Sequence, residues 1–230
     1  MRIAIDGPGG AGKSTIARAL AQRLGYFYVD TGAMYRCCAY WAREQGVDPG
    51  SPSAVRQMME EIPLRVERGA QGPELRLNGR APGLEIRSPE ISELASQISA
   101  DPACRARLTA IQQEIAARQS VVMDGRDIGT VVLPEAELKI YLTASAPERA
   151  RRRYRELLER GEDVAYEDIL RDLEIRDRRD SERAVAPLRP ATDAVIVDSD
   201  KLGVEEVLER IMEALAAVQA GGQNAGRGEA

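Results

Sequence analysis

The sequence of 230 residues contains no histidine and only one tryptophan and one phenylalanine. The missing histidine excludes histidine metal ligands and histidine general bases from every site in the chain. No apolar run approaches the roughly 18 residues that a membrane helix needs. The N-terminus carries no secretory pattern, because a short apolar run at 2–5 leads directly into a glycine-rich turn. These absences predict a cytoplasmic protein that has no membrane partner.

Cysteine and lysine are scarce as well. The cysteines Cys37, Cys38 and Cys104 are odd in number and lack metal-type spacing, so we expect reduced and mostly buried thiols. The 32 basic residues are arginines except for Lys13, Lys139 and Lys201. The formal net charge of −5 disfavours a large basic surface, and nucleic acid is therefore not an expected partner.

Short apolar runs alternate with helical periodicities along most of the chain, whose length suits one α/β domain with insertions. The expected strands are 2–5, 26–30, 120–123, 138–142 and 194–197. The expected helices are 13–24, 32–45 with Thr31 as its cap, 89–99 with Ser88 as its cap, 102–118 with Asp101 as its cap, two on either side of Gly161, and 203–218. This alternation predicts a mostly parallel sheet with helices on both faces, although periodicity does not give the strand order.

Three segments depart from this alternation. In 63–87 the apolar period changes to two, in three short runs at Leu64 and Val66, Leu75 and Leu77, and Leu84 and Ile86. This pattern predicts a small antiparallel sheet inserted between helices. In 149–183 there are 11 arginines and 11 acidic residues, so most of these side chains are expected on solvated helix faces. The glycine-rich segment 220–230 is predicted to be disordered.

The segment 7–14 matches the phosphate-loop pattern G-x-x-x-x-G-K-[ST] in full, between an expected strand and an expected helix. Its glycines let successive N–H groups turn toward phosphate oxygens, and the following helix adds the positive end of its dipole. Lys13 can reach the β- and γ-phosphates, and Ser14 offers a hydroxyl to Mg²⁺. The predicted ATP-binding residues here are Gly7, Pro8, Gly9, Gly10, Ala11, Gly12, Lys13, Ser14 and Thr15.

The loop does not identify the phosphoryl acceptor. The chain lacks the Asn-Lys pair with which GTPases read guanine. It also lacks the combination found in transporter-type ATPases, in which a glycine-rich signature is followed by an apolar strand that ends in Asp-Glu. A kinase for a small phosphorylated acceptor fits the length better. Such an acceptor needs fixed cations beside the donor site, and the candidates are Arg36, Arg126, Arg176 and Arg183.

Three further motifs identify a family. They are Asp30-Thr31-Gly32-Ala33-Met34-Tyr35-Arg36, Asp124-Gly125-Arg126-Asp127-Ile128-Gly129-Thr130, and the stretch from Arg176 to Leu188 that ends in Arg183-Ala184-Val185-Ala186-Pro187-Leu188. With the phosphate loop, these motifs closely resemble the bacterial cytidylate kinases in register and spacing from about residue 2 to residue 218. The insertion at 63–87 also resembles the extension of the bacterial members.

The resemblance implies a P-loop NTPase-type α/β fold with a parallel five-stranded sheet, an acceptor-binding insertion and a helical lid. The implied regions are a core at 1–30, 119–145 and 184–219, an acceptor-binding region at 31–118 and a lid at 146–183. The implied reaction moves the γ-phosphoryl group of ATP, with Mg²⁺, to CMP or dCMP. We expect a monomer.

The resemblance also implies individual roles. Thr31, Arg36 and Arg126 would hold the acceptor phosphate, with Thr31 standing where the family has serine. Ser96, Arg105, Asp127 and Arg183 would read cytosine, and register favours Arg105 over Arg107. Arg176 and Asp180 would lie near the ribose and the transferring phosphate. Lys13, Arg126 and Arg176 would be catalytic, and Arg153 would reach ATP when the lid closes.

Cytosine recognition has an independent chemical basis. A carboxylate such as Asp127 can accept a hydrogen bond from the N4 amino group, while arginine and serine donate to N3 and O2. Uracil places a carbonyl opposite that carboxylate, a mismatch that costs about 1–3 kcal/mol.

Some assignments stay open at this stage. Asp30 is either a carboxylate near Mg²⁺ or a helix cap, and Asp124 either orients a metal-bound water or is a turn residue. Tyr35 and Trp41 are interpreted as core residues. Alternative functions are a kinase for uridylate, thymidylate or dephospho-coenzyme A, a regulator that binds ATP as a switch, and a nucleic-acid-binding module.

Overall fold

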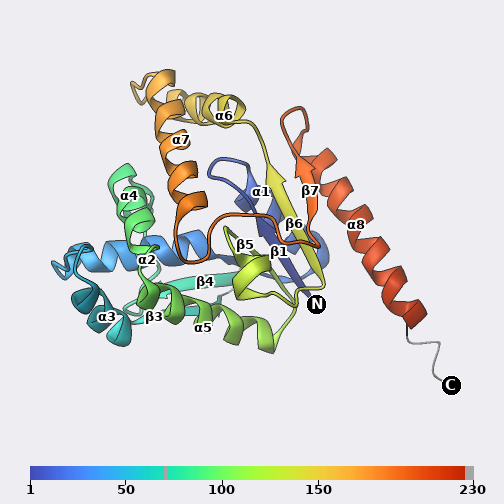
Figure 1. The fold of residues 1–230 in the computed structure, drawn as a ribbon, viewed down its shortest axis with the longest axis horizontal. Helices are drawn as coiled ribbons and strands as arrows, with labels where there is room; N and C mark the ends of the chain where they lie inside the picture. The colour runs from blue at the N-terminus through green and yellow to red at the C-terminus, as the bar shows by residue number, and fades with distance from the viewer. Residues whose placement is uncertain (70–71, 226–230) are drawn as a thin grey trace.

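The computed structural model describes residues 1–69 and 72–225, and within them five parallel strands form the main sheet. Its order is β2-β5-β1-β6-β7, of which Figure 1 labels the last four strands. The strands are β1 (Arg2–Asp6), β2 (Phe27–Asp30), β5 (Val121–Gly125), β6 (Leu138–Thr143) and β7 (Val195–Asp198). The predicted fold class and all five predicted strands are confirmed. Because the strands are parallel, the ends of β1, β2 and β5 that carry the phosphate loop and the acidic motifs meet at one edge.

Two apolar cores lie on opposite faces of this sheet. Ile3 and Ile5 of β1 pack with α1 (Lys13–Leu24) and α8 (Val204–Ala225), whereas Ala4 between them faces the other core. That alternation is the period of two expected of a strand covered on both faces. The second core is formed with α2 (Thr31–Glu44), α3 (Pro52–Glu61), α4 (Pro89–Ile98) and α5 (Pro102–Arg118).

Side-chain caps set several helix starts. Ser88 accepts from the Ile91 amide at the start of α4, and Asp101 accepts from two amides at the start of α5. Helix α2 begins one residue earlier than predicted, because Asp30 rather than Thr31 caps it. These caps satisfy amides that the first turn of a helix leaves without partners.

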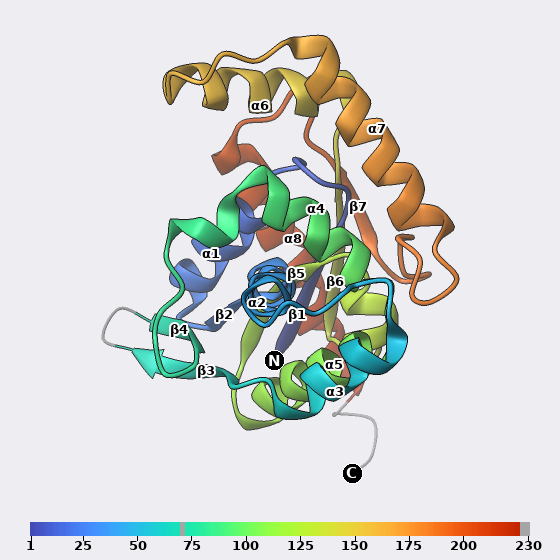
Figure 2. The same cartoon turned by 90° about the vertical axis from the view of Figure 1, so that its left-hand side faces the viewer.

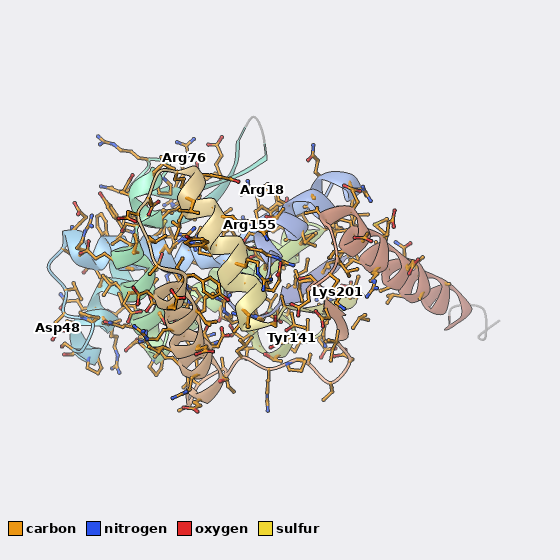
Figure 3. All side chains as sticks on the ribbon, turned by 90° about the horizontal axis from the view of Figure 1, so that it is seen from above. Arg18, Asp48, Arg76, Tyr141, Arg155 and Lys201 are labelled. Atoms are coloured by element: carbon orange, nitrogen blue, oxygen red, sulfur yellow. The ribbon has the colours of Figure 1, made fainter. Side chains whose placement is uncertain are left out.

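Two charged helices stand apart from the sheet, α6 (Ala146–Glu159) and α7 (Tyr166–Glu182) (Figure 2). They share a small apolar cluster of their own around Ala150, Leu157 and Ile169. Seen from above, α6 with its exposed Arg155 and α7 face the viewer over the rest of the molecule (Figure 3). This segment therefore has its own local packing.

Several elements differ from the sequence prediction. Helix α3 was not expected, although Pro52 at its first turn and Val55, Met58 and Met59 on its buried side are typical of a helix. The inserted sheet has two strands, β3 (Leu64–Gly69) and β4 (Gly72–Leu77), which pair antiparallel. The expected third strand is instead a 3₁₀ turn, η1 (Leu84–Arg87), which buries Ile86 and leaves Leu84 exposed.

The chain ends also differ from the prediction. Helix α8 continues beyond Val218 to Ala225, so the predicted disorder from residue 220 is wrong for its first part, and 226–230 lie outside the described residues. Ala214, Ala216 and Ala217 in the preceding turn are strong helix formers, and propagation of a helix is easier than its initiation. Within the described residues, no helix combines the length and the apolar character required to cross a membrane.

Candidate active site

The turn between β1 and α1 has the backbone that a phosphate loop requires. Gly7, Gly10 and Gly12 have φ angles of 150°, 78° and 87°, which residues with a Cβ atom rarely adopt. A Cβ atom on Gly7 would lie 1.9 Å from the Leu142 carbonyl oxygen, so only glycine fits there. Lys13 at the start of α1 is buried, and its ammonium group donates to the Pro8 carbonyl at 2.7 Å. The loop thus folds around its own lysine.

A buried carboxylate lies beside this loop at the end of β5. Asp124 accepts from the Ser14 hydroxyl at 2.8 Å and from the Tyr28 hydroxyl at 3.0 Å. The Thr31 hydroxyl donates to the Asp124 carbonyl oxygen at 2.6 Å. Burial, followed by repulsion from Asp30, raises the pKa of Asp124 to about 6. A cation placed here would relieve that repulsion.

These oxygen atoms fit Mg²⁺, which prefers hard oxygen ligands and usually keeps several waters. The available donors are the Ser14 hydroxyl and the Asp124 carboxylate, with the Asp30 carboxylate nearby. Within residues 1–69 and 72–225, no group of three or more acidic, cysteine or histidine side chains forms a metal cage. Asp30 itself is the cap of α2, since it accepts from the Ala33 amide at 2.7 Å.

A cavity of about 220 Å³ opens from the phosphate loop toward α4, α5 and α7. All nine residues predicted for the acceptor line it, and so do four of the nine predicted phosphate-loop residues. The lining residues are Gly9, Gly10, Lys13, Ser14, Asp30, Thr31, Gly32, Tyr35, Arg36, Ala95, Ser96, Ser99, Arg105, Asp124, Gly125, Arg126, Asp127, Arg176, Asp180 and Arg183. Residues from both halves of the chain therefore line the same cavity.

The part of the cavity next to the loop is rich in cations. Within the described structure, the Nε atoms of Arg36 and Arg176 are buried and have no hydrogen-bond partner. Arg126 donates through Nε to Asp180 at 2.9 Å. Burial, and then the charge of Arg126, lowers the pKa of Arg176 to about 10 and also lowers that of Lys13. Such mutual repulsion among buried cations creates a site for anions.

The far part of the cavity is organised around Asp127. Both of its oxygens are engaged, one by Arg105 and the other by Arg183 at 3.5 Å. Arg105 also lies over the ring of Tyr35, with its guanidinium carbon 5.6 Å from the ring centroid. Tyr35 packs against the core, as predicted, and it also lines the cavity.

Two other basic residues, the predicted Arg153 and the less favoured alternative Arg107, lie elsewhere. Arg153 on α6 pairs with Glu156 at 2.8 Å and does not line the cavity, so its predicted contact with ATP stays a prediction. Arg107 faces a separate groove between α5 and β3, whereas Arg105 faces the cavity, as the register favoured.

Sequence reasoning missed Arg149. This buried side chain at the start of α6 donates to the Gly9 carbonyl oxygen at 2.8 Å, to the Ala144 carbonyl oxygen at 2.9 Å and to Asp177 of α7. It therefore connects the phosphate loop with both charged helices. Its position among the many arginines of 149–183 gave no signal, because neither motif nor periodicity distinguishes it.

Known proteins resemble this chain over nearly its whole length. The family model described as cytidylate kinase matches residues 3–217. The cytidylate kinase of Carboxydothermus hydrogenoformans is 48% identical over 213 residues, which cover 93% of this chain and 96% of that protein. The cytidylate kinase of Thermosipho melanesiensis is 49% identical over 212 residues, which cover 92% and 95%.

Among solved structures, an uncharacterized protein from Eubacterium ventriosum shares the fold, with a TM-score of 0.51 and 11% identity. The match covers 94% of this chain and 98% of that one. The family match and the identity over more than nine tenths of the chain lead to one assignment: this chain belongs to the cytidylate kinase family.

Proposed function

We propose that this protein transfers the γ-phosphoryl group of ATP to CMP or dCMP and releases ADP with CDP or dCDP. One observation carries this proposal. A single cavity joins a phosphate loop to a cation-rich zone and then to a carboxylate held by two guanidinium groups. The relatives from Carboxydothermus and Thermosipho are named for the same activity.

Each zone of the cavity suits one part of the two substrates. The loop amides and Lys13 suit the triphosphate, and the unpartnered Nε atoms of Arg36 and Arg176 suit the acceptor phosphate. Asp127 keeps free lone pairs beside its two arginines, so it can accept from a cytosine amino group. Uracil would place a carbonyl oxygen there, and we expect roughly 10- to 100-fold poorer use of UMP.

The chemistry needs no general base, because the acceptor phosphate is already an anionic nucleophile near neutral pH. Lys13, Arg126 and Arg176 align the two anions and stabilise the charge of a loose transition state. Ser14 and Asp124 would hold Mg²⁺, which when bound neutralises charge on the β- and γ-phosphates. The Ser14 hydroxyl donates to the Asp124 carboxylate, so the two oxygen atoms that would hold the metal lie next to each other.

We assign the acceptor-binding region to 31–118 and the lid to 146–183, with the core at 1–30, 119–145 and 184–219. The separate apolar cluster of α6 and α7 supports a lid that moves as a unit and excludes water. The buried free thiols Cys37, Cys38 and Cys104 suit a reducing cytoplasm.

A coupled assay for ADP release tests the proposal. Purified protein with ATP and Mg²⁺ is given CMP, dCMP, UMP, TMP and dephospho-coenzyme A in turn. We expect turnover of a few per second or more with CMP or dCMP, and negligible ATP hydrolysis without an acceptor. Failure to phosphorylate any pyrimidine monophosphate would refute the proposal, and preference for another acceptor would reassign the substrate.

A further inference from the structure

The family resemblance implies that Ser96 binds the cytosine base. Besides lining the cavity, Ser96 contacts a residue of helix α7. Helix α7 runs beside α4 (Figure 1), and Nη1 of Arg179 donates to the Ser96 hydroxyl oxygen at 3.2 Å. The same nitrogen donates to Glu93 at 2.8 Å, one turn before Ser96 on α4. Ser96 is buried and lines the cavity, whereas Arg179 lies outside it.

This contact restricts what the serine can do. A hydroxyl group has one proton and two acceptor lone pairs, and it rotates to suit its partners. An arginine has no acceptor, so Arg179 can only donate to Ser96 and must occupy a lone pair of that oxygen. The hydroxyl proton cannot then point at Arg179, which leaves it available for donation to a base in the cavity that Ser96 lines.

A serine fixed as a donor distinguishes the two pyrimidines where it faces N3, because O2 is an acceptor in both bases. Cytosine has acceptors at both N3 and O2, whereas uracil has an N–H donor at N3. A freely rotating hydroxyl could accept from that N–H, but a hydroxyl whose lone pair is already occupied is less able to do so. The orientation therefore adds to the discrimination by Asp127.

We propose that Arg179 is a positioning residue that orients the Ser96 hydroxyl as a hydrogen-bond donor and so raises selectivity for cytosine over uracil. This inference rests on the proposed function, since it concerns the base subsite of that reaction. The competing interpretation is that Arg179 makes only a surface ion pair with Glu93, because 37% of its side chain is exposed. Exposed pairs of this kind contribute little.

Substitutions at the three residues separate these interpretations. Arg179→Met removes both contacts, Glu93→Gln removes only the ion pair, and Ser96→Ala removes the oriented hydroxyl. We expect Arg179→Met to lower the ratio of kcat/KM for CMP to that for UMP by about 3- to 10-fold, the scale of one hydrogen bond. The change should appear mainly in KM for CMP. Glu93→Gln should leave the ratio within about 2-fold, and Arg179→Lys should restore part of it because lysine can also donate.

The double variant Ser96→Ala with Arg179→Met completes a double-mutant cycle for these two residues. Its selectivity should equal that of Ser96→Ala alone, because no hydroxyl remains for Arg179 to orient. An unchanged ratio in Arg179→Met, an equal loss in Glu93→Gln, or an undiminished effect of Arg179→Met in the Ser96→Ala background would each overturn the inference. Turnover of CMP by the wild-type enzyme is measured in the same series, and its absence would refute the proposed function instead.

Discussion

At the residue scale, the feature with the largest functional consequence is a set of buried cations without enough anions. Lys13 is buried, and Arg176 is half-buried with its Nε atom buried. Each has its pKa lowered first by desolvation and then by the charge of Arg126. Such an arrangement costs free energy in the empty protein. Bound phosphates would repay that cost, so these residues favour a site filled by two anions over an empty one.

Removal of the Lys13 ammonium group tests this view. We expect Lys13→Ala to lower kcat at least about 100-fold, the scale for losing one preorganised donor at the transferring group. Stability should change little or rise, because a desolvated charge has been removed. Steady-state kinetics with ATP and CMP, together with thermal unfolding, give both quantities.

Lys139 provides the matched control. It is the second buried lysine among the described residues, its partner Asp193 is exposed, and neither residue lines the cavity. Lys139→Ala should keep kcat within about 2-fold, since Asp193 can be solvated on its own. A Lys13→Ala enzyme with near-normal kcat would contradict the assigned role of the ammonium group.

A motif that constrains several residues at once allows the sequence to predict which side chains lie together in the fold. The phosphate loop predicts the position of Lys13, because strand, turn and helix must follow in that order. The residues missed, Arg149 and Arg179, act on groups more than 80 positions away in the sequence. Only the fold brings those partners together, and nothing in the charged segment distinguishes them from arginines on solvated faces.

At the element scale, Asp6 joins the end of β1 to the short π-helix η2 (Ile128–Val132). Its two carboxylate oxygens accept from the Ile128 and Gly129 amides, each at 2.7 Å. Burial nevertheless raises the pKa of Asp6 to about 6, against an ordinary value of 3.8. The folded protein therefore binds this proton more tightly than the unfolded chain does.

A defined pH dependence follows. Between about pH 4 and pH 6, Asp6 binds more protons in the folded state than in the unfolded state. The contribution of Asp6 to the free energy of unfolding therefore falls as the pH rises, and it levels off above pH 6. The free energy of unfolding of the wild type minus that of Asp6→Asn should therefore be larger at pH 4.5 than at pH 7, by roughly 1–3 kcal/mol. Urea unfolding of both proteins at the two values gives the comparison. A difference that grows with pH would mean that the two amide bonds outweigh burial.

Arg149 connects three elements, and its removal should affect ATP more than the acceptor. Arg149→Ala leaves the Gly9 carbonyl without this donor and Asp177 without its cation. We expect kcat/KM for ATP to fall about 10- to 100-fold, since a hydrogen bond from a charged group contributes about 1.5–3 kcal/mol. Arg151→Ala on the same helix is the control, because Arg151 is exposed and pairs only with Glu148 among the described residues. If Arg149→Ala lowered thermal stability but left the ATP kinetics unchanged, the role of Arg149 would be structural only.

Elements were predictable where local chemistry and burial agree. The caps Ser88 and Asp101 gave the starts of α4 and α5, and continuous apolar runs gave the strands of the main sheet. The segment 84–87 failed because an alternation of Leu84 and Ile86 suits both a strand and a 3₁₀ turn with one buried side chain. Tertiary packing against α2 and α4 decides between them.

At the scale of the whole molecule, two large cores hold the sheet, and α6 with α7 has only a small apolar cluster. The contacts of this helical pair with the rest of the chain include many charges, among them Arg126–Asp180, Arg183–Asp127 and Arg179–Glu93. Charged contacts can exchange partners with phosphate oxygens at little cost, whereas an apolar interface cannot. Arg126 and Arg183, which would bind the substrates, thus also hold the proposed lid.

Hydrogen exchange can test whether α6 and α7 move relative to the sheet. In the free protein, we expect amides of α6 and α7 to exchange faster than those of β1 and β5, because few apolar contacts oppose local opening. CMP together with a non-hydrolysable ATP analogue should slow exchange in α6 and α7 markedly, since both anions recruit arginines from this segment. Helix α8, which packs on the opposite face from the acceptor region, is the internal control and should not change. Equal protection of α6 and α7 with and without the two nucleotides would show that this helical pair is a fixed part of the fold, and the arginines would then have to bind substrate without any closure.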